Sequence, residues 1–134
     1  MQRSDLEQAI EYLRQRIATL RAVYLFGSQS REESGPKSDV DLAFLANLSP
    51  GARERFQMAS DLSEMLGREV DLVDLAAAST VMRAQVIGRG TRVAGTVSPA
   101  LEEFESRVLS DYARLNEERA AILRDIEQRG TVHG

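Results

Sequence analysis

Hydrophobic residues recur along the chain with two different periods, and these periods predict the order of its helices and strands. The first apolar residues have helical spacing: Leu6, Ile10, Leu13 and Ile17. They predict a helix over residues 4–20. Ser4 followed by Glu7 is the pattern of a capping box, so we expect this helix to begin at Ser4.

Later segments alternate between the two periods. Runs rich in β-branched and aromatic residues predict strands over residues 22–27, 39–45, 69–75 and 91–95. Helices are predicted from Ser49-Pro50 to Leu66 before Gly67, from Ser79 to Ile87, and from Ser98-Pro99 to Gln128. The link between the first two strands is too short for a helical crossover, which favours an antiparallel or mixed sheet.

The length of 134 residues favours one domain. We expect an α/β (α+β) fold with a small mixed sheet, helices packed on one face and a long C-terminal helix. Val40, Leu42 and Phe44 would pack against those helices, and the alternating aspartates would line the uncovered face. Residues 1–97 would form the core, and the helix and tail of residues 98–134 would belong to the same domain.

Composition narrows the class of protein. The chain has no cysteine, so it can have neither disulfides nor thiolate chemistry, which fits a reducing compartment. It shows no signal peptide and no apolar run that spans a bilayer, so we expect a cytoplasmic protein without membrane contact. The net charge is −4 and the arginines are scattered, so we expect no nucleic-acid binding. The one histidine, His133, is read as a solvated tail residue.

Asp39 and Asp41 are the first candidates for chemistry. Side chains two apart on a strand point to the same face, so these two carboxylates project together. Such a pair is often only the solvated face of a strand, but like charges this close also attract a divalent cation. Oxygen ligands suit Mg²⁺, with Mn²⁺ as the alternative, and Mg²⁺ sites commonly include substrate phosphates.

A turn that can bind phosphate precedes the aspartates. Gly27 and Ser28 end the first predicted strand, where backbone N–H groups and the Ser28 hydroxyl could bind phosphate oxygens. Arg31 lies one turn further on and either reaches the same phosphates or is a solvated loop residue. The stretch is therefore either a nucleotide-binding turn or an ordinary turn.

A third carboxylate comes from the segment EVDLVDL, residues 69–75. Asp71 and Asp74 fall on opposite faces of this predicted strand. If Asp71 faces the other aspartates, Val70 and Leu72 join the core. If Asp74 does, Asp71 lies on the core face, which is costly for a charge. We favour Asp71.

Gly27-Ser28, ten residues, and then Asp39-Val40-Asp41 resemble the signature of the DNA polymerase β nucleotidyltransferase superfamily. The short length resembles its minimal nucleotidyltransferase (MNT) branch, best known as the antitoxin partner of HEPN-domain toxins. Many relatives have arginine and glycine where this chain has Gln29 and Glu32.

The resemblance implies a polymerase-β-type fold and transfer of AMP from ATP to a tyrosine hydroxyl of a HEPN toxin, which neutralises the toxin. Asp39 and Asp41 would hold two Mg²⁺ ions, one of them shared with Asp71, which would help to remove the hydroxyl proton. Gly27, Ser28 and Arg31 would hold the β- and γ-phosphates. Two alternatives remain: transfer to a small-molecule hydroxyl, and a non-catalytic antitoxin that acts by occlusion.

The last predicted helix is longer than a domain of this size is wide. Its apolar stripe continues to the end: Leu101, Phe104, Val108, Tyr112, Leu115, Ile122 and Ile126. Either the helix bends back on its own core, or a second protein covers the distal part. The MNT resemblance favours a HEPN toxin as that partner.

Overall fold

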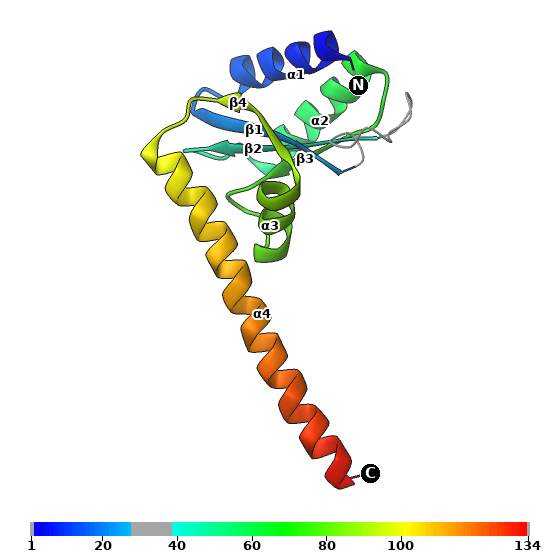
Figure 1. Cartoon of the computed structure of the whole chain (residues 1–134). Helices are drawn as coiled ribbons and strands as arrows, with labels where there is room; N and C mark the ends of the chain where they lie inside the picture. The colour runs from blue at the N-terminus through cyan, green and yellow to red at the C-terminus, as the bar shows by residue number, and fades with distance from the viewer. Residues whose placement is uncertain (1, 28–38, 134) are drawn as a thin grey trace.

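The structure is a computed structural model that describes residues 2–27 and 39–133, with side chains as far as residue 129. All eight predicted elements are present (Figure 1). In chain order they are α1 (Arg3–Arg16), β1 (Leu20–Phe26), β2 (Val40–Ala46), α2 (Ala52–Leu66), β3 (Val70–Asp74), α3 (Thr80–Arg89), β4 (Thr91–Gly95) and α4 (Pro99–His133).

The strands form a mixed sheet, as the sequence predicts, and the structure gives their order as β3-β2-β1-β4. β1 pairs antiparallel with β2 and with β4, and β2 pairs parallel with β3. Parallel strands need a crossover of a dozen or more residues, and α2 supplies it between β2 and β3. β3 is therefore an edge strand.

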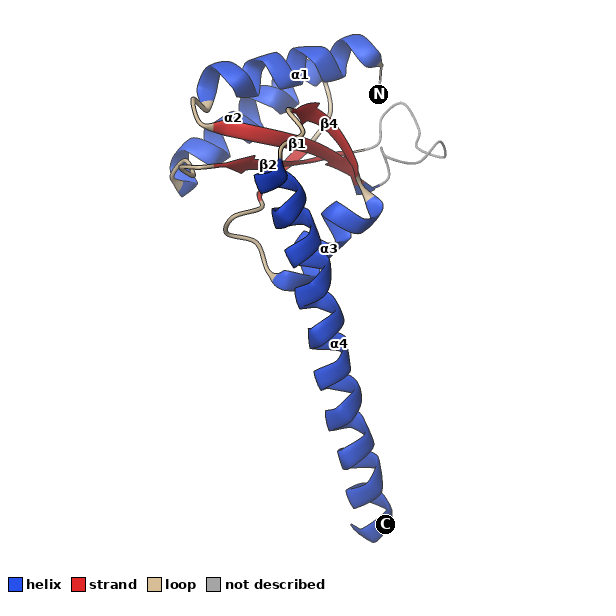
Figure 2. Ribbon diagram, turned by 60° about the vertical axis from the view of Figure 1, so that its left-hand side comes forward, coloured by secondary structure: helices blue, strands red, loops and turns tan. Residues whose placement is uncertain are grey.

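The expectation that helices pack on one face of the sheet is wrong, because they cover both. α1 and α2 lie over one face, and α3 with the first part of α4 lies over the other (Figures 1 and 2). The physical reason lies in the two central strands, which are apolar on both faces. Val23, Val40, Leu42 and Phe44 are buried toward α1 and α2, while Ala22, Tyr24, Ala43 and Leu45 are buried on the other face.

Three helix ends agree with the sequence. Gly67 closes α2 with a φ of 65°, a left-handed conformation that glycine adopts without steric cost. Ser79 caps α3, because its hydroxyl accepts a hydrogen bond of 3.1 Å from the N–H of Met82. Ser98 caps α4 in the same way, accepting from the N–H of Leu101 at 3.2 Å.

Two helix starts differ from the sequence prediction. α1 begins at Arg3 with Gln2 at the N-cap and no side-chain cap, so the expected capping box at Ser4 does not form. Glu7 instead pairs with Arg3 one turn before it, at 3.3 Å. α2 begins at Ala52, with Gly51 rather than a serine at its N-cap.

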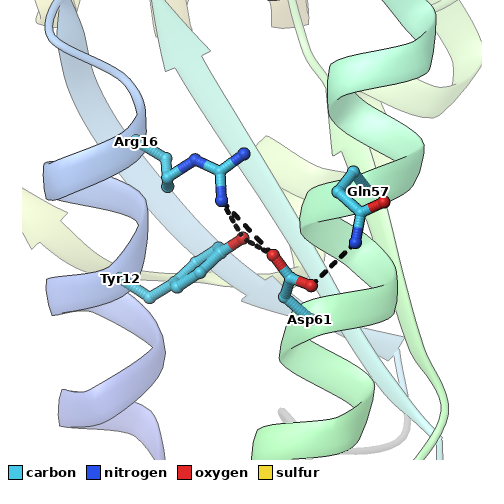
Figure 3. A network of polar contacts seen from close by, with 4 residues as sticks. All are labelled: Tyr12, Arg16, Gln57 and Asp61. Carbon is cyan, nitrogen blue, oxygen red and sulfur yellow. Dashed lines mark hydrogen bonds and ion pairs between the residues drawn. The ribbon is translucent and has the colours of Figure 1, made fainter.

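A polar network joins α1 to α2 (Figure 3). The Tyr12 hydroxyl donates to Asp61, which also accepts from Gln57 at 2.9 Å and pairs with Arg16 at 3.3 Å. Burial and the Asp61 hydrogen bond raise the pKa of Tyr12 to about 12, so the hydroxyl stays protonated as the donor. This network fixes the angle between the two helices that cover the core face.

A second polar cluster fixes the first part of α4 to the sheet. The Tyr24 hydroxyl donates to Glu105 of α4 at 2.9 Å, and Arg92 of β4 pairs with the same carboxylate. Burial, and next the Glu105 hydrogen bond, raise the pKa of Tyr24. Three elements therefore meet at Glu105, and they set the direction in which α4 leaves the sheet.

Beyond this attachment α4 continues alone, away from the sheet (Figure 1). Residues 99–133 form one helix, and every side chain from 116 to 129 is exposed. The alternative in which the helix bends back on its own core is therefore wrong. Ile122, Leu123 and Ile126 remain exposed on this distal part. Within the described residues, no helix has both the length and the hydropathy to cross a membrane.

We predict that Tyr24→Phe lowers the free energy of unfolding by about 1–2 kcal/mol, because it removes a hydrogen bond to a charged acceptor that is partly buried. Denaturant unfolding of both proteins measures the difference. Tyr112→Phe is the matched control on α4, and it should change stability by less than about 0.5 kcal/mol. Equal effects of the two substitutions would contradict a fixing role for the Tyr24–Glu105 contact.

Candidate functional site

The parallel register of β2 and β3 places two predicted carboxylates side by side. Asp41 lies opposite Asp71, between the pairs Val40–Val70 and Leu42–Leu72. Neighbours in this register point to the same face of a sheet, so the aspartates share one face while the flanking residues enter the core against α2. Asp39 lies two residues before Asp41 and is exposed.

The pKa of Asp41 reflects the negative charges gathered at this end of the sheet. Partial burial raises the pKa of Asp41, and so do the charge of Asp71, a hydrogen bond between the two side chains and the charge of Asp39. A hydrogen bond between two carboxyl groups requires a proton on one of them. The pair therefore holds a position that a proton occupies at low pH and that a cation can occupy at neutral pH.

Gly27 lies against the same carboxylate. It follows Phe26, which pairs with Asp41 across β1 and β2. Its φ is +71°, and a Cβ placed on it would lie 2.1 Å from Asp41 Oδ2. Any side chain here would be strained and would displace the carboxylate. Glycine is thus required for a reason that the sequence does not reveal, namely contact with Asp41.

Asp71 and Asp74 have different surroundings. Asp71 is exposed beside Asp41, whereas Asp74 is 4% exposed and caps the following turn by accepting from the N–H of Ala76 at 3.0 Å. Val70 and Leu72 lie in the core, as the choice of Asp71 requires. The structure therefore places Asp71, and not Asp74, with the other aspartates.

Four of the six predicted site residues lie together in the structure: Gly27, Asp39, Asp41 and Asp71. Ser28 and Arg31 lie outside the described residues, so their predicted phosphate contacts stay predictions. His133 is likewise beyond the described side chains.

The aspartates fit a hard divalent cation by their chemistry. In residues 2–27 and 39–133, no three acidic or histidine side chains are gathered as a ready metal site. Mg²⁺ does not require three, since it commonly binds through one or two carboxylates together with substrate phosphates. Asp41 and Asp71, already close enough to share a proton, can supply those carboxylates.

Next to Asp71 lies a pocket of about 500 Å³ between β3 and α2. Arg55, Phe56 and Ser60 line it from the helix. None of these three residues is among the site residues predicted from the sequence. The sequence does contain one indication of this pocket. Phe56 is a large apolar residue that does not share the helix face on which Met58 and Leu62 are buried.

Comparison with known proteins places this geometry in a family. The model of the family described as "Polymerase beta, Nucleotidyltransferase" matches residues 7–96, which include every predicted site residue. The chain belongs to this nucleotidyltransferase family. The fold expected from the resemblance is thereby confirmed.

One relative with a named activity is similar over nearly the whole chain. A protein adenylyltransferase, MntA of Shewanella oneidensis, is 38% identical over 126 residues, covering 94% of this chain and 90% of the relative.

Two solved structures are also similar. One contains a tri-AMPylated Shewanella oneidensis HEPN toxin in complex with MNT antitoxin; it matches with a TM-score of 0.79 and 37% identity, covering 95% of this chain and 99% of the other. A toxin–antitoxin structure with AMP-PNP matches with a TM-score of 0.81 and 38% identity, covering 90% and 97%.

We predict that Mg²⁺ stabilises the protein against heat and that Asp41→Asn removes most of this effect. Without metal, the raised pKa of Asp41 means that stability is lost as pH rises through that pKa. The substitution should therefore leave the metal-free protein as stable as before, or more so, at pH 7. At a Mg²⁺ concentration about ten times Kd, binding adds about 1.4 kcal/mol.

Thermal unfolding at pH 7 in EDTA and in Mg²⁺ provides the measurement. Asp111→Asn on α4, far from the site, is the control and should keep the full Mg²⁺ effect. An equal Mg²⁺ shift in Asp41→Asn and the unsubstituted protein would contradict the assignment of Asp41 as a ligand.

Proposed function

We propose that this chain is an antitoxin-type protein adenylyltransferase. It transfers AMP from ATP to a tyrosine hydroxyl of a HEPN toxin, and this modification neutralises the toxin. The observation that carries the proposal is the placement of Asp41 beside Asp71 with Gly27 against the carboxylate, in a chain that aligns over 94% of its length with a protein adenylyltransferase.

In this proposal the acceptor oxygen forms a bond to the α-phosphorus of ATP, and the bond from that phosphorus to pyrophosphate breaks. The proton of the hydroxyl passes to Asp71. Asp39, Asp41 and Asp71 would hold Mg²⁺, which supplies charge for the entering and leaving oxygens. Gly27, Ser28 and Arg31 would bind the β- and γ-phosphates and keep the α-phosphorus in line.

The alternatives are less consistent with the molecule. Enzymes that transfer a nucleotide to a small molecule usually carry an additional domain that binds this substrate. In the present structure α4 extends away from the sheet and does not cover the site (Figure 1). Inhibition by occlusion alone would not require Asp41 and Asp71 to lie side by side at one end of the sheet. We place the reaction in the cytoplasm, where ATP is available. The chain has no cysteine, so it needs no oxidising compartment in which to form disulfides.

The distal part of α4 is the proposed docking surface for the toxin. Ile122, Leu123 and Ile126 are more than half exposed there, and α4 otherwise makes its contacts through its first part. A helix that carries an apolar stripe beyond its own domain is typical of a chain that buries this stripe against a partner.

The direct test is the intact mass of a candidate HEPN toxin after incubation with this chain, ATP and Mg²⁺. A mass increase by whole AMP units supports the proposal. Complex formation without a mass change would favour occlusion and would overturn the catalytic assignment.

We predict that Asp71→Ala abolishes AMP transfer with no loss of thermal stability, because the side chain is exposed. Asp74→Ala should do the opposite. It removes a buried carboxylate that caps the turn at Ala76, at a cost of about 1–3 kcal/mol, while the folded fraction keeps its transfer activity. Transfer rates at saturating Mg²⁺-ATP, together with melting temperatures, separate the two. An inactive Asp74→Ala beside an active Asp71→Ala would reverse the assignment of the third acid.

We predict that Ile122→Glu with Ile126→Glu leaves the melting temperature of the lone protein within about 2 °C, since both side chains are more than half exposed. Binding to the HEPN protein should weaken at least tenfold, because each carboxylate would be buried without a partner. A pull-down and a thermal melt measure the two effects.

Ala120→Glu, an exposed position on the opposite side of α4, is the matched control and should bind normally. A double variant that keeps full binding would exclude this part of α4 from the interface.

A further inference from the structure

The pocket between α2 and β3 has no role in the reaction as proposed so far. It has a volume of about 500 Å³ and is lined by Arg55, Phe56, Ser60, Glu69, Asp71 and Leu72, among others. Across the sheet the order is Gly27 at the end of β1, Asp41 on β2, Asp71 on β3 and then the pocket. The pocket and Gly27 therefore lie on opposite sides of the carboxylates.

The main chain of β3 presents hydrogen-bonding groups toward this pocket. Val40 N–H donates to Glu69 O at 2.9 Å, and Leu75 N–H donates to Phe44 O at 3.0 Å. The odd-numbered residues of this segment thus bond to β2, and the even-numbered ones turn their backbone groups to the outer edge. The Val70 N–H is bound there by the Ser63 hydroxyl at 2.9 Å. Leu72 is the next residue whose backbone faces the edge.

Phe56 supplies an apolar contact at the pocket. It lies on the side of α2 away from the buried stripe of Met58 and Leu62, and it is 76% exposed. An aromatic ring in this position contributes little to the fold of the chain itself. It can bury its surface only against something that enters the pocket.

We propose that this pocket binds an extended segment of the acceptor protein, which adds to the edge of β3 beside Leu72. An apolar side chain of that segment packs on Phe56, and the acceptor hydroxyl reaches Asp71. Leu72 supplies the backbone groups for this pairing, since the Val70 N–H is already bound by the Ser63 hydroxyl. This inference rests on the proposed function and adds the route by which the acceptor enters.

A peptide fits this pocket better than the nucleobase of ATP for two reasons. Backbone groups that face outward from an edge strand, such as those of Leu72, are complementary to another main chain. The triphosphate is expected at the Gly27 turn, on the far side of Asp41 from the pocket, so the opposite side of Asp71 is left for the attacking group.

Steady-state kinetics of Phe56→Ala test the proposal, with the HEPN toxin that the unsubstituted protein modifies as acceptor. We expect KM for the acceptor protein to rise at least tenfold, while the affinity for Mg²⁺-ATP measured by calorimetry stays within twofold. Leu48→Ala is the matched control, because Leu48 is 74% exposed and lies after the opposite end of β2. It should leave both quantities unchanged.

A photo-crosslinking amino acid at position 56 locates the bound segment directly. We expect it to crosslink to the acceptor peptide that carries the AMP-modified residue, and the same group at position 48 to give no such product. An unchanged acceptor KM, or crosslinks confined to another part of the acceptor, would overturn the proposal. A loss of ATP affinity in Phe56→Ala would overturn it in favour of a nucleobase site.

Failure of the proposed function gives a different result. In that case the unsubstituted protein would transfer no AMP to the HEPN protein. The crosslink at position 56 would still report whether the edge of β3 binds a segment of the HEPN protein, so the two failures are distinguishable.

Discussion

The in-register parallel pairing of β2 with β3 is the constraint on which the site depends. It holds Asp41 beside Asp71 because Val70 and Leu72 are buried on the other face. Burying two such side chains contributes about 3–6 kcal/mol. Two like charges about 4 Å apart near a surface cost about 1–4 kcal/mol. The burial of Val70 and Leu72 is thus of the same size as the repulsion or larger, and it opposes separation of the two carboxylates.

The register of the two strands also explains why Asp41 is paired with Asp71 and with no other residue of β3. A shift of one residue would turn Asp71 into the core face and Leu72 out to solvent, so the fold strongly disfavours it. Gly27 adds a second restraint from β1, because its lack of a Cβ leaves room for the Asp41 carboxylate. Three strands thus define the site from their backbones, with little dependence on flexible side chains.

The sequence was sufficient for the elements whose signals are local. The mixed sheet, the Gly67 and Ser79 helix ends and the facing of Asp71 all follow from periodicity and turn residues near each element. The prediction of a single covered face fails because it extends the polar pattern of Asp39 and Asp41 to all of β2. Further along that strand, Ala43 and Leu45 are apolar on the same face and require α3 and α4 above them.

Long-range contacts account for the rest of the difference. Nothing near Tyr24 in the sequence indicates that its hydroxyl bonds to Glu105, 81 residues away. The pocket at Asp71 likewise needs α2 and β3 at a particular separation, which the Ser63 hydroxyl helps to set by accepting from the Val70 N–H. Such features arise from tertiary packing, whereas strand alternation alone is enough to predict that Asp41 and Asp71 share one face of the sheet.

The free-standing part of α4 has a consequence for the lifetime of the protein. Residues 116–129 have no buried side chain, so this part has only the marginal stability of an isolated helix of its length. It opens locally far more often than the sheet does, and open segments are where proteases cut. A bound partner would close this route. The amount of chain that survives in a cell would then follow the amount of partner available to bind it, and unbound copies would be degraded first.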